Sequence, residues 1–326
     1  MRRGPTILIL PGSFVREMHS EPTETASPER GVAALEWAEK VGLEGPTALA
    51  SAPTRPGAAD LRAVPLATVR AHLDRILVAK HAEPGLDALH EGGVLDAWMP
   101  EVAGLVGFGD GEWRHKDVWK HTKQVVRQAV PHLAVRWGAL LHDIGKPRTR
   151  SIDPSGEVHF FGHAEVGASM FRKRVSKRLG FDAELHERVH FLILYHLRAS
   201  QYDGSWTDSA VRRFAREMGP GLDDLLALSR ADITTKRPHR KKRGLRQISD
   251  LAARIREIQV ADARVAPLPK GLGHAIMEAF GVPPSRKLGE IRDALEALCG
   301  EGVLEGGKDA PYYVDYLREH PELVGA

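Results

Sequence analysis

The sequence predicts an all-α protein, a helical bundle preceded by neck helices and followed by a helical tail. Two observations support this fold class. From Pro65 onward, apolar residues recur at spacings of three and four, which is the period of an amphipathic helix. Only the short runs ILIL (7–10) and VHFF (158–161) resemble the alternating or continuous apolar pattern of a strand.

The size and composition are those of a globular protein. A chain of 326 residues can form one large domain or two smaller ones. Hydrophobic residues at 42% and charged residues at 27% exclude disordered and membrane classes, and the net charge of +3 is too small to indicate nucleic-acid binding by itself. The single cysteine, Cys299, excludes a disulfide framework and a thiolate metal cluster. We therefore expect a cytoplasmic protein with no membrane partner.

Four segments are expected along the chain. Residues 1–27 form an N-terminal tail that we expect to be flexible, 28–110 a helical neck, 111–262 the central domain and 263–326 the C-terminal helical tail. Stretches rich in Pro, Ser, Thr and Ala at 20–31 and 48–60 are expected to be linkers. Apolar spacing predicts helices at 66–77, 117–130, 133–144, 164–179, 183–197, 209–218, 222–235, 245–262 and 287–299.

Several polar side chains interrupt the apolar faces of these helices. His121 lies three residues after Val118 and four before Val125, so it points inward with them. The other such residues are His142 and Asp143 at the end of an apolar helix, His163, His196 and Asp232.

A buried metal site would explain this set. One inward histidine is most simply a hydrogen-bonded core residue, and one buried aspartate usually caps a helix or pairs with arginine. An unpartnered buried carboxylate costs several kcal/mol, so two aspartates and four histidines in one core need compensation. Divalent metals supply it, because imidazole and carboxylate oxygen are suitable ligands. We expect one ion on the ligands His121, His142, Asp143 and Asp232, and a second on His163 and His196 with Asp143 bridging.

The series His121, His142-Asp143 and Asp232, with the motif ALLHDIGKP, resembles the HD superfamily of metal-dependent phosphohydrolases. The stretches LLALSRADI and FGVPPSRKLGEIRDALEALCGEGVL resemble the C-terminal part of bacterial CCA-adding tRNA nucleotidyltransferases and poly(A) polymerases, and RGVAALEWAEKVGLEG resembles their neck. The resemblance covers residues 28–326. The nucleotidyltransferase head of that family is not matched, because no Asp-x-Asp follows PGSFVRE, and nucleotidyl transfer is not expected.

The resemblance implies phosphoester hydrolysis. A metal-bound water loses a proton near neutral pH, and the resulting hydroxide attacks phosphorus. Asp143 is then a ligand and a proton acceptor. Lys146 contacts phosphate or, alternatively, only interacts with a helix C-terminus. Weaker candidates for phosphate binding are Arg148, Arg198 and His115, the last of which can instead support a metal ligand.

Nucleotides or RNA ends that carry 2′,3′-cyclic phosphates or 2′-phosphates are the implied substrates. The ligand set does not distinguish Ni, Co, Mn, Fe, Zn and Mg. The basic run KRPHRKKRGLR (236–246) is either a solvated loop or a contact for the backbone of tRNA or another RNA. Trp113 and Trp119 either pack in the core or line a nucleoside pocket.

Two other hypotheses remain open on the sequence alone. The protein is alternatively an RNA-binding module with a vestigial HD site, or a diiron oxygenase, because some HD proteins use a similar ligand set with redox iron. Metal-dependent cleavage of a cyclic nucleotide that His142→Ala abolishes would exclude the first alternative. A mixed-valent iron signal would favour the second.

Overall fold

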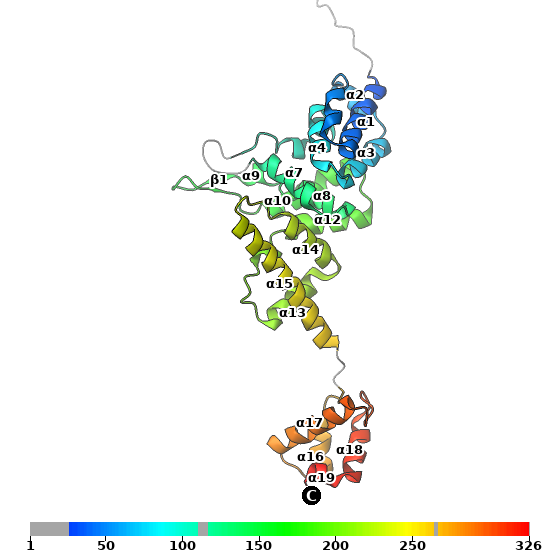
Figure 1. Ribbon diagram of the computed structural model, residues 1–326, viewed down its shortest axis with the longest axis vertical. Coiled ribbons are helices and arrows are strands. Elements are labelled where there is room, and N and C mark those ends of the chain that lie inside the picture. The colour runs from blue at the N-terminus through cyan, green and yellow to red at the C-terminus, as the bar shows by residue number, and fades with distance from the viewer. Residues whose placement is uncertain (1–25, 110–116, 264–266, 326) are drawn as a thin grey trace, which may run out of the picture. The chain divides into compact units, whose positions relative to one another are not determined.

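The computed structural model describes residues 26–109, 117–263 and 267–325, and within them it confirms the all-α class (Figure 1). The helices of the N-terminal half are α1 Pro28–Glu44, η1 Pro46–Ser51, α2 Ala58–Ala63, α3 Leu66–Val78, α4 Ala82–Glu91, α5 Val94–Trp98, α6 Pro100–Ala103, α7 Val118–Gln128, α8 Leu133–Leu141 and α9 Lys146–Thr149. The strands are β1 Ser151–Ile152 and β2 Val158–His159. The remaining helices are α10 His163–Met170, the π-helical η2 Phe171–Val175, α11 Ser176–Leu179, α12 Ala183–Tyr195, η3 Ala199–Gln201, α13 Asp208–Met218, η4 Gly219–Gly221, α14 Leu222–Ala231, α15 Pro238–Ala263, α16 Leu272–Phe280, α17 Arg286–Gly300, α18 Ala310–Glu319 and α19 Pro321–Val324.

The chain divides into two compact units. Unit 1 contains the described residues up to Gln201 together with Pro220–Leu245, and unit 2 contains Tyr202–Gly219 and the described residues from Arg246 onward. The neck helices thus belong to the same compact unit as α7 to α12. The segment boundaries expected from the sequence remain predictions.

Helix α8 is the centre of unit 1. Every residue from Ala134 to Leu141 is buried, and the helix contacts α3, α7, α12 and α14. This explains why its sequence is apolar on all sides. At Gly138 a Cβ atom would come within 2.9 Å of Leu192, so the absence of a side chain lets α8 and α12 approach closely. A helix buried on all sides carries the residues at its C-terminal end into the interior.

Helix α7 is amphipathic and begins at a side-chain cap. Asp117 accepts a hydrogen bond from the backbone N–H of Lys120 (3.1 Å). The helix packs on α4, α8 and α14, with Val118, Thr122 and Val125 buried. His121 lies on this side of the helix, and its side chain is only 11% exposed.

Several element boundaries differ from those expected. Helix α8 ends at Leu141 and α14 at Ala231, each about one turn early, so His142, Asp143 and Asp232 follow the helices instead of lying within them. Helix α15 begins at Pro238, where proline suits the first position of a helix, so most of the basic run is helical and not a loop.

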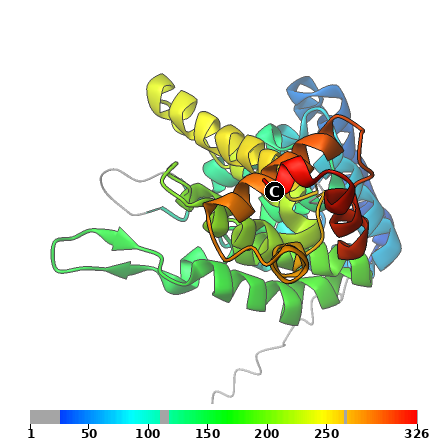
Figure 2. The same cartoon turned by 90° about the horizontal axis from the view of Figure 1, so that it is seen from below.

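The stretches expected to be linkers or strands differ as well. Residues 48–60, expected to be a linker, contain the end of η1 and the start of α2. Residues 1–25, which include the run ILIL and most of the expected flexible tail, lie outside the described residues. Of the run VHFF, only Val158 and His159 are in a strand, and they pair antiparallel with Ile152 and Ser151. This hairpin projects from the helices of unit 1 (Figure 2).

Unit 2 has a separate apolar core in its C-terminal part. Helices α16 to α19 and the loops beside them contribute its buried residues, which are Leu268, Leu272, Ile276, Ile291, Leu295, Leu304, Tyr313, Val314, Leu317 and Val324. None of the helices in the described residues is long and apolar enough to span a membrane.

Candidate metal centre

Helix ends bring most of the predicted ligands together. His142, His196 and Asp232 are the C-cap residues of α8, α12 and α14, and His163 is the first residue of α10. Asp143 follows His142 in the turn between α8 and α9. Of the six residues, only His121 lies in the interior of a helix, α7. The short side chains at helix ends reach the interior of unit 1 without distorting a helix.

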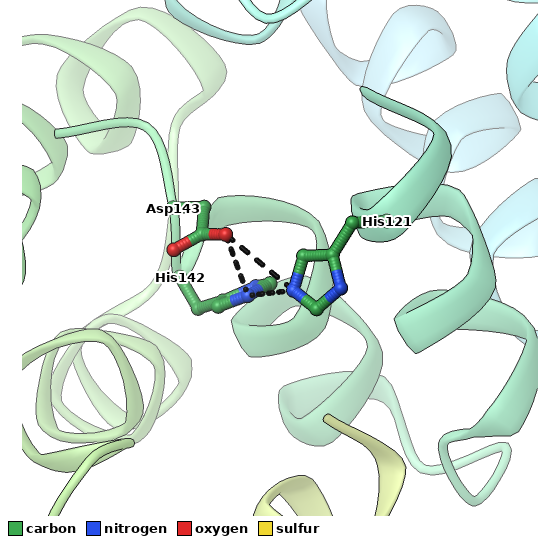
Figure 3. A group of neighbouring side chains, drawn as sticks. All are labelled: His121, His142 and Asp143. Carbon is green, nitrogen blue, oxygen red and sulfur yellow. Dashed lines mark hydrogen bonds and ion pairs between the residues drawn. The ribbon is translucent and has the colours of Figure 1, made fainter. Parts of the chain in front are cut away.

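One half of the cluster surrounds the Oδ2 atom of Asp143 (Figure 3). This oxygen lies 3.2 Å from His142 Nε2 and 3.5 Å from His121 Nε2, and the two imidazole nitrogens are 3.3 Å apart. Asp232 Oδ1 approaches the same two nitrogens, at 3.0 Å from His121 and 3.8 Å from His142. These four side chains are those expected to hold the first ion.

The other half of the cluster faces Asp143 Oδ1. His163 Nε2 lies 3.5 Å from this oxygen and 3.2 Å from His196 Nε2. Asp143 therefore lies between the two groups, with one carboxylate oxygen directed to each, which is the arrangement expected of a bridging ligand. His142 and Asp143 are each 1% exposed, and His196 is 2% exposed.

Hydrogen bonds fix the orientation of every imidazole. The Nδ1 atoms of His142, His163 and His196 each lie 2.8 Å from the backbone carbonyl oxygen three residues earlier. His121 Nδ1 lies 2.9 Å from the hydroxyl of Thr234. A carbonyl oxygen only accepts, so Nδ1 carries a proton in the first three rings, and each Nε2 is directed toward the other side chains of the cluster. For the two residues at C-caps, the carbonyl is one of those that a helix leaves without a partner.

The donor set fits divalent metal ions. Neutral imidazole nitrogens and carboxylate oxygens are ligands for Zn, Ni, Co, Fe and Mn. His163 Nε2 and His196 Nε2 face each other at 3.2 Å, and because both Nδ1 atoms donate to carbonyls, the two Nε2 lone pairs repel unless a cation lies near both. Thr234 and the carbonyl partners are the hydrogen-bonded supports that metal-binding histidines usually have. No thiolate takes part, since Cys299 is in unit 2.

The electrostatics favour an ionised Asp143. Burial disfavours its charged form, but the His142 imidazole and Lys146 outweigh burial and hold the pKa of Asp143 well below its usual range. Burial also opposes the charged form of His142, and the adjacent Asp143 carboxylate outweighs it, so the pKa of His142 is raised. The buried carboxylate of Asp143 and the imidazole of His142 thus stabilise each other's charged forms.

Three further predicted ligands, His163, His196 and Asp232, have lowered pKa values. Burial, with a smaller contribution from His142, lowers the pKa of His196 to about 4. Burial also lowers the pKa of His163. Burial raises the pKa of Asp232, but the hydrogen bond with His121 together with the nearby imidazoles of His142 and His121 outweighs burial, and the pKa falls to about 2. Both histidines are therefore neutral, and Asp232 is ionised, near neutral pH.

Lys146 lies next to the cluster. Its Nζ atom is 2.7 Å from Asp143 Oδ2, on the same oxygen that faces His121 and His142, and its side chain is 20% exposed. A cation at this rim is suitably placed for an anionic ligand.

The structure describes two of the three weaker phosphate-binding candidates, Arg148 and Arg198. Arg148 is exposed on α9 and lines a surface pocket with Glu101, Ile144 and Met170; none of the six cluster residues lines that pocket. Arg198 is half-buried, two residues after His196. His115 and Trp113 lie outside the described residues. Trp119 is 5% exposed, which favours core packing over a nucleoside pocket.

Thr234 and Gly145 are site residues that the sequence did not predict. Thr234 follows Asp232 by two residues in a non-helical stretch, where no periodicity marks it. Gly145 lies between Asp143 and Lys146, and a Cβ atom there would come within 2.1 Å of the backbone oxygen of His163. The sequence signal that could have identified Gly145 is its place in the motif HDIGK, where a Gly-Lys pair closely follows the His-Asp pair.

A second group of possible ligands lies on the hairpin. Asp153, Glu157 and His159 are close enough together to share an ion, but they are half-buried or exposed. The Asp153 carboxylate already accepts hydrogen bonds from Ser155, Glu157 and His159. This group is therefore explained by the hairpin turn.

Comparison with known proteins identifies the class of this centre. Residues 118–263 match the family model described as the HD domain, so the chain contains an HD domain, as predicted. The chain is similar to the CC-adding tRNA nucleotidyltransferase of Thermus thermophilus, with 31% identity over 77% of this chain and 56% of the relative. It is also similar to the A-adding tRNA nucleotidyltransferase of Deinococcus radiodurans, with 31% identity over 77% of this chain and 58% of the relative. A multifunctional CCA protein of Pseudomonas paraeruginosa is 34% identical over 44% of this chain and 35% of its own length.

These matches confirm the predicted resemblance to CCA-adding enzymes. The chain spans a little over half the length of its relatives from Thermus and Deinococcus. The aligned share of this chain is larger than the HD domain alone, which covers residues 118–263.

Proposed function

We propose that this protein is a metal-dependent phosphohydrolase that cleaves phosphoesters of nucleotides or RNA ends, of the 2′,3′-cyclic phosphodiesterase and phosphatase type. The observation that carries the proposal is the convergence of His121, His142, Asp143 and Asp232 on one side, and His163 and His196 on the other, of a single buried carboxylate. The HD domain supports it, because that superfamily consists of metal-dependent phosphohydrolases.

In this proposal the six side chains hold one or two divalent ions. A bound divalent ion supplies Lewis acidity and makes hydroxide available from water near neutral pH. Asp143, ionised and adjacent to both halves, is the group that accepts a proton from water. Lys146 binds a non-bridging phosphate oxygen and offsets the charge that develops on it. The Nδ1 hydrogen bonds keep each imidazole in one tautomer and one orientation.

We further propose an RNA partner. The relatives are named for acting on tRNA. The basic run that follows Thr235 is exposed at Lys236, Arg237, Arg240 and Lys242, and it begins four residues after Asp232 within unit 1. Exposed cations without intervening carboxylates suit contacts with a phosphate backbone. In this proposal the RNA backbone binds the same unit that holds the six predicted ligands.

The test pairs metal analysis with a substrate screen. We expect the purified protein to contain one or two transition-metal ions per chain, and to hydrolyse nucleoside 2′,3′-cyclic phosphates after metal loading. His142→Ala should lose both properties. Binding of tRNA without hydrolysis of any phosphomonoester, cyclic nucleotide or dNTP would contradict the proposal and favour an RNA-binding module.

The same screen covers two other activities. The relatives are named for nucleotide addition, so incorporation of CTP and ATP into tRNA ends is assayed in parallel, and we expect none. Full hydrolysis with Zn or Ni under anaerobic conditions would exclude a diiron oxygenase. An oxygen-dependent reaction with a mixed-valent iron signal would overturn the hydrolase assignment.

A further inference from the structure

Phe161 is an unusual residue of the hairpin that leads into α10. Its side chain is 77% exposed, more than any other large apolar residue that the structure describes. Its neighbour Phe160 is half-buried, with its ring 6.2 Å from that of Phe108 and 5.6 Å from Lys146 Nζ. Exposure of a phenyl ring to water is unfavourable in free energy, because the apolar surface is not buried. An exposed aromatic residue of this kind can mark a binding site.

The ring of Phe161 is held in a defined orientation. It stacks on the imidazole of His159, with 4.9 Å between ring centroids and 13° between planes. His159 Nε2 in turn lies 3.1 Å from Asp153 Oδ2. The other oxygen of Asp153 accepts hydrogen bonds from the backbone N–H groups of Ser155 and Glu157, which fixes the turn of the hairpin. One face of Phe161 is therefore covered by an anchored imidazole, and its exposure leaves the other face open to solvent.

This ring lies beside the metal centre along the chain. Phe161 precedes His163 by two residues, so their Cα atoms are within about 7 Å. The carbonyl of Phe160 accepts the Nδ1 hydrogen bond of His163 (2.8 Å). Lys146, which contacts the ring of Phe160, also contacts Asp143. Phe161 is thus close in the chain to two residues, Phe160 and His163, that contact Lys146 or belong to the cluster.

We propose that Phe161, backed by His159, stacks on the nucleobase of the nucleotide whose phosphate is bound at the metal centre. The inference rests on the proposed function and specifies how the site selects a nucleotide over other phosphoesters. Every base has a π face, and a phenyl ring offers no hydrogen bonds, so the platform accepts all four bases. The bound base lies on the face of Phe161 opposite His159.

The first test compares two cyclic phosphodiesters, a nucleoside 2′,3′-cyclic phosphate and the base-free glycerol 1,2-cyclic phosphate. We expect Phe161→Ala to raise KM for the nucleotide about tenfold or more with little change in kcat, since stacking on one aromatic residue gives a preference of this size. KM for the glycerol ester should stay unchanged in Phe161→Ala. Phe161→Trp should preserve the wild-type KM for both substrates. Ile152→Ala is the matched control, because Ile152 is an exposed apolar residue (56%) on the same hairpin.

The proposal is overturned if Phe161→Ala changes KM for the two substrates by the same factor, or changes KM for neither. A second measurement separates its failure from that of the proposed function, because it does not need hydrolysis. A short RNA with 4-thiouridine at its 3′ end is irradiated with the purified protein, and the crosslinked peptide is identified by mass spectrometry. We expect a crosslink at Phe161 that Phe161→Ala abolishes and Ile152→Ala retains. A crosslink elsewhere that Phe161→Ala does not affect would refute base stacking, even if the protein hydrolyses nucleotides.

Discussion

At the scale of single residues, the orientation of the four imidazoles depends on hydrogen-bond partners that are not among the six predicted ligands. Three rings donate Nδ1–H to carbonyls three residues earlier, and these bonds require only the backbone. His121 differs, because its partner is the side chain of Thr234. The orientation of the His121 ring can therefore be changed by a side-chain substitution at position 234.

Replacement of Asp143 tests its position between the two halves. We expect Asp143→Asn to weaken divalent-metal binding at least about 100-fold, because the amide loses the charge that both groups of nitrogens face. Isothermal titration calorimetry, in which metal is added to the metal-free protein, measures this change in affinity. Asp153→Asn is the control, since that carboxylate serves the hairpin turn. Equal losses in the two variants would contradict the assignment.

Replacement of Thr234 tests the support of His121. Thr234→Val keeps the shape but removes the hydroxyl, and we expect metal affinity to fall about 10- to 100-fold. Thr122→Val is a matched control on α7. The Thr122 hydroxyl is buried without a hydrogen-bond partner in the described chain, so this change should leave metal affinity intact and stability equal or about 1 kcal/mol higher. Unchanged metal binding in Thr234→Val would show that His121 does not need this partner.

Candidate metal ligands can be predicted from the sequence when they are polar residues on the apolar face of a helix. His121, His163 and His196 lie in line with buried residues of their own helices, and that pattern is visible without coordinates. Thr234 escaped prediction because it lies in a non-helical stretch and acts through a hydrogen bond across the fold. Helical spacing contains no information about such a contact.

At the scale of elements, the ends of the helices determine the geometry of the site. Helices α8 and α14 were expected to continue through His142, Asp143 and Asp232. Apolar periodicity locates the middle of a helix but not its end, because the last turn is decided by hydrogen bonds to orphan carbonyls. In α8 the imidazole of His142 makes such a bond to Ala139. The predicted metal ligand His142 is thus also a group that caps the end of the helix.

One ion pair connects α6 with α11 in unit 1. Glu101 is 9% exposed and accepts two hydrogen bonds from the guanidinium of Arg178, both at 2.8 Å. Burial opposes the charged form of Glu101, but Arg178 outweighs it and lowers the pKa below its ordinary value of 4.5.

We expect Glu101→Gln to lower the free energy of unfolding by about 2 kcal/mol at pH 7, because it leaves Arg178 partly buried without its partner. A depressed pKa stabilises the fold above pH 4.5, and this contribution is lost as the pH falls through the folded-state pKa. Denaturant titrations of wild type and variant should therefore converge below pH 4.5. The control is Asp96→Asn, whose partner Arg55 is 59% exposed and whose removal should cost less than about 0.5 kcal/mol. A difference that persists at low pH would contradict the role of the ion pair.

At the scale of the whole molecule, the metal centre gathers residues from α7 to the end of α14. All six side chains belong to unit 1, whereas the core of α16 to α19 belongs to unit 2. Binding of metal to the folded state alone should stabilise unit 1 by about 3 kcal/mol at a free concentration 100 times the Kd.

We expect calorimetry to show this gain as a higher Tm for one thermal transition, which a chelator reverses. The other transition should be insensitive to metal and should fall in Leu295→Ala, because Leu295 is 0% exposed in the core of α16 to α19. A metal-dependent shift of both transitions by equal amounts would show that the two units unfold together.

The close approach at Gly145 has a consequence for efforts to alter this protein. The backbone at this position is ordinary, with φ of −77° and ψ of −22°, so other residues are conformationally allowed there. What excludes them is space, because the methyl carbon of an alanine would lie 2.1 Å from the His163 oxygen. In a saturation library, alanine at position 145 should push the two metal-binding turns apart while leaving the overall helicity intact. We therefore expect Gly145→Ala to lower divalent-metal affinity in a titration of the purified protein, and unchanged affinity would show that the two turns can separate without cost to the cluster.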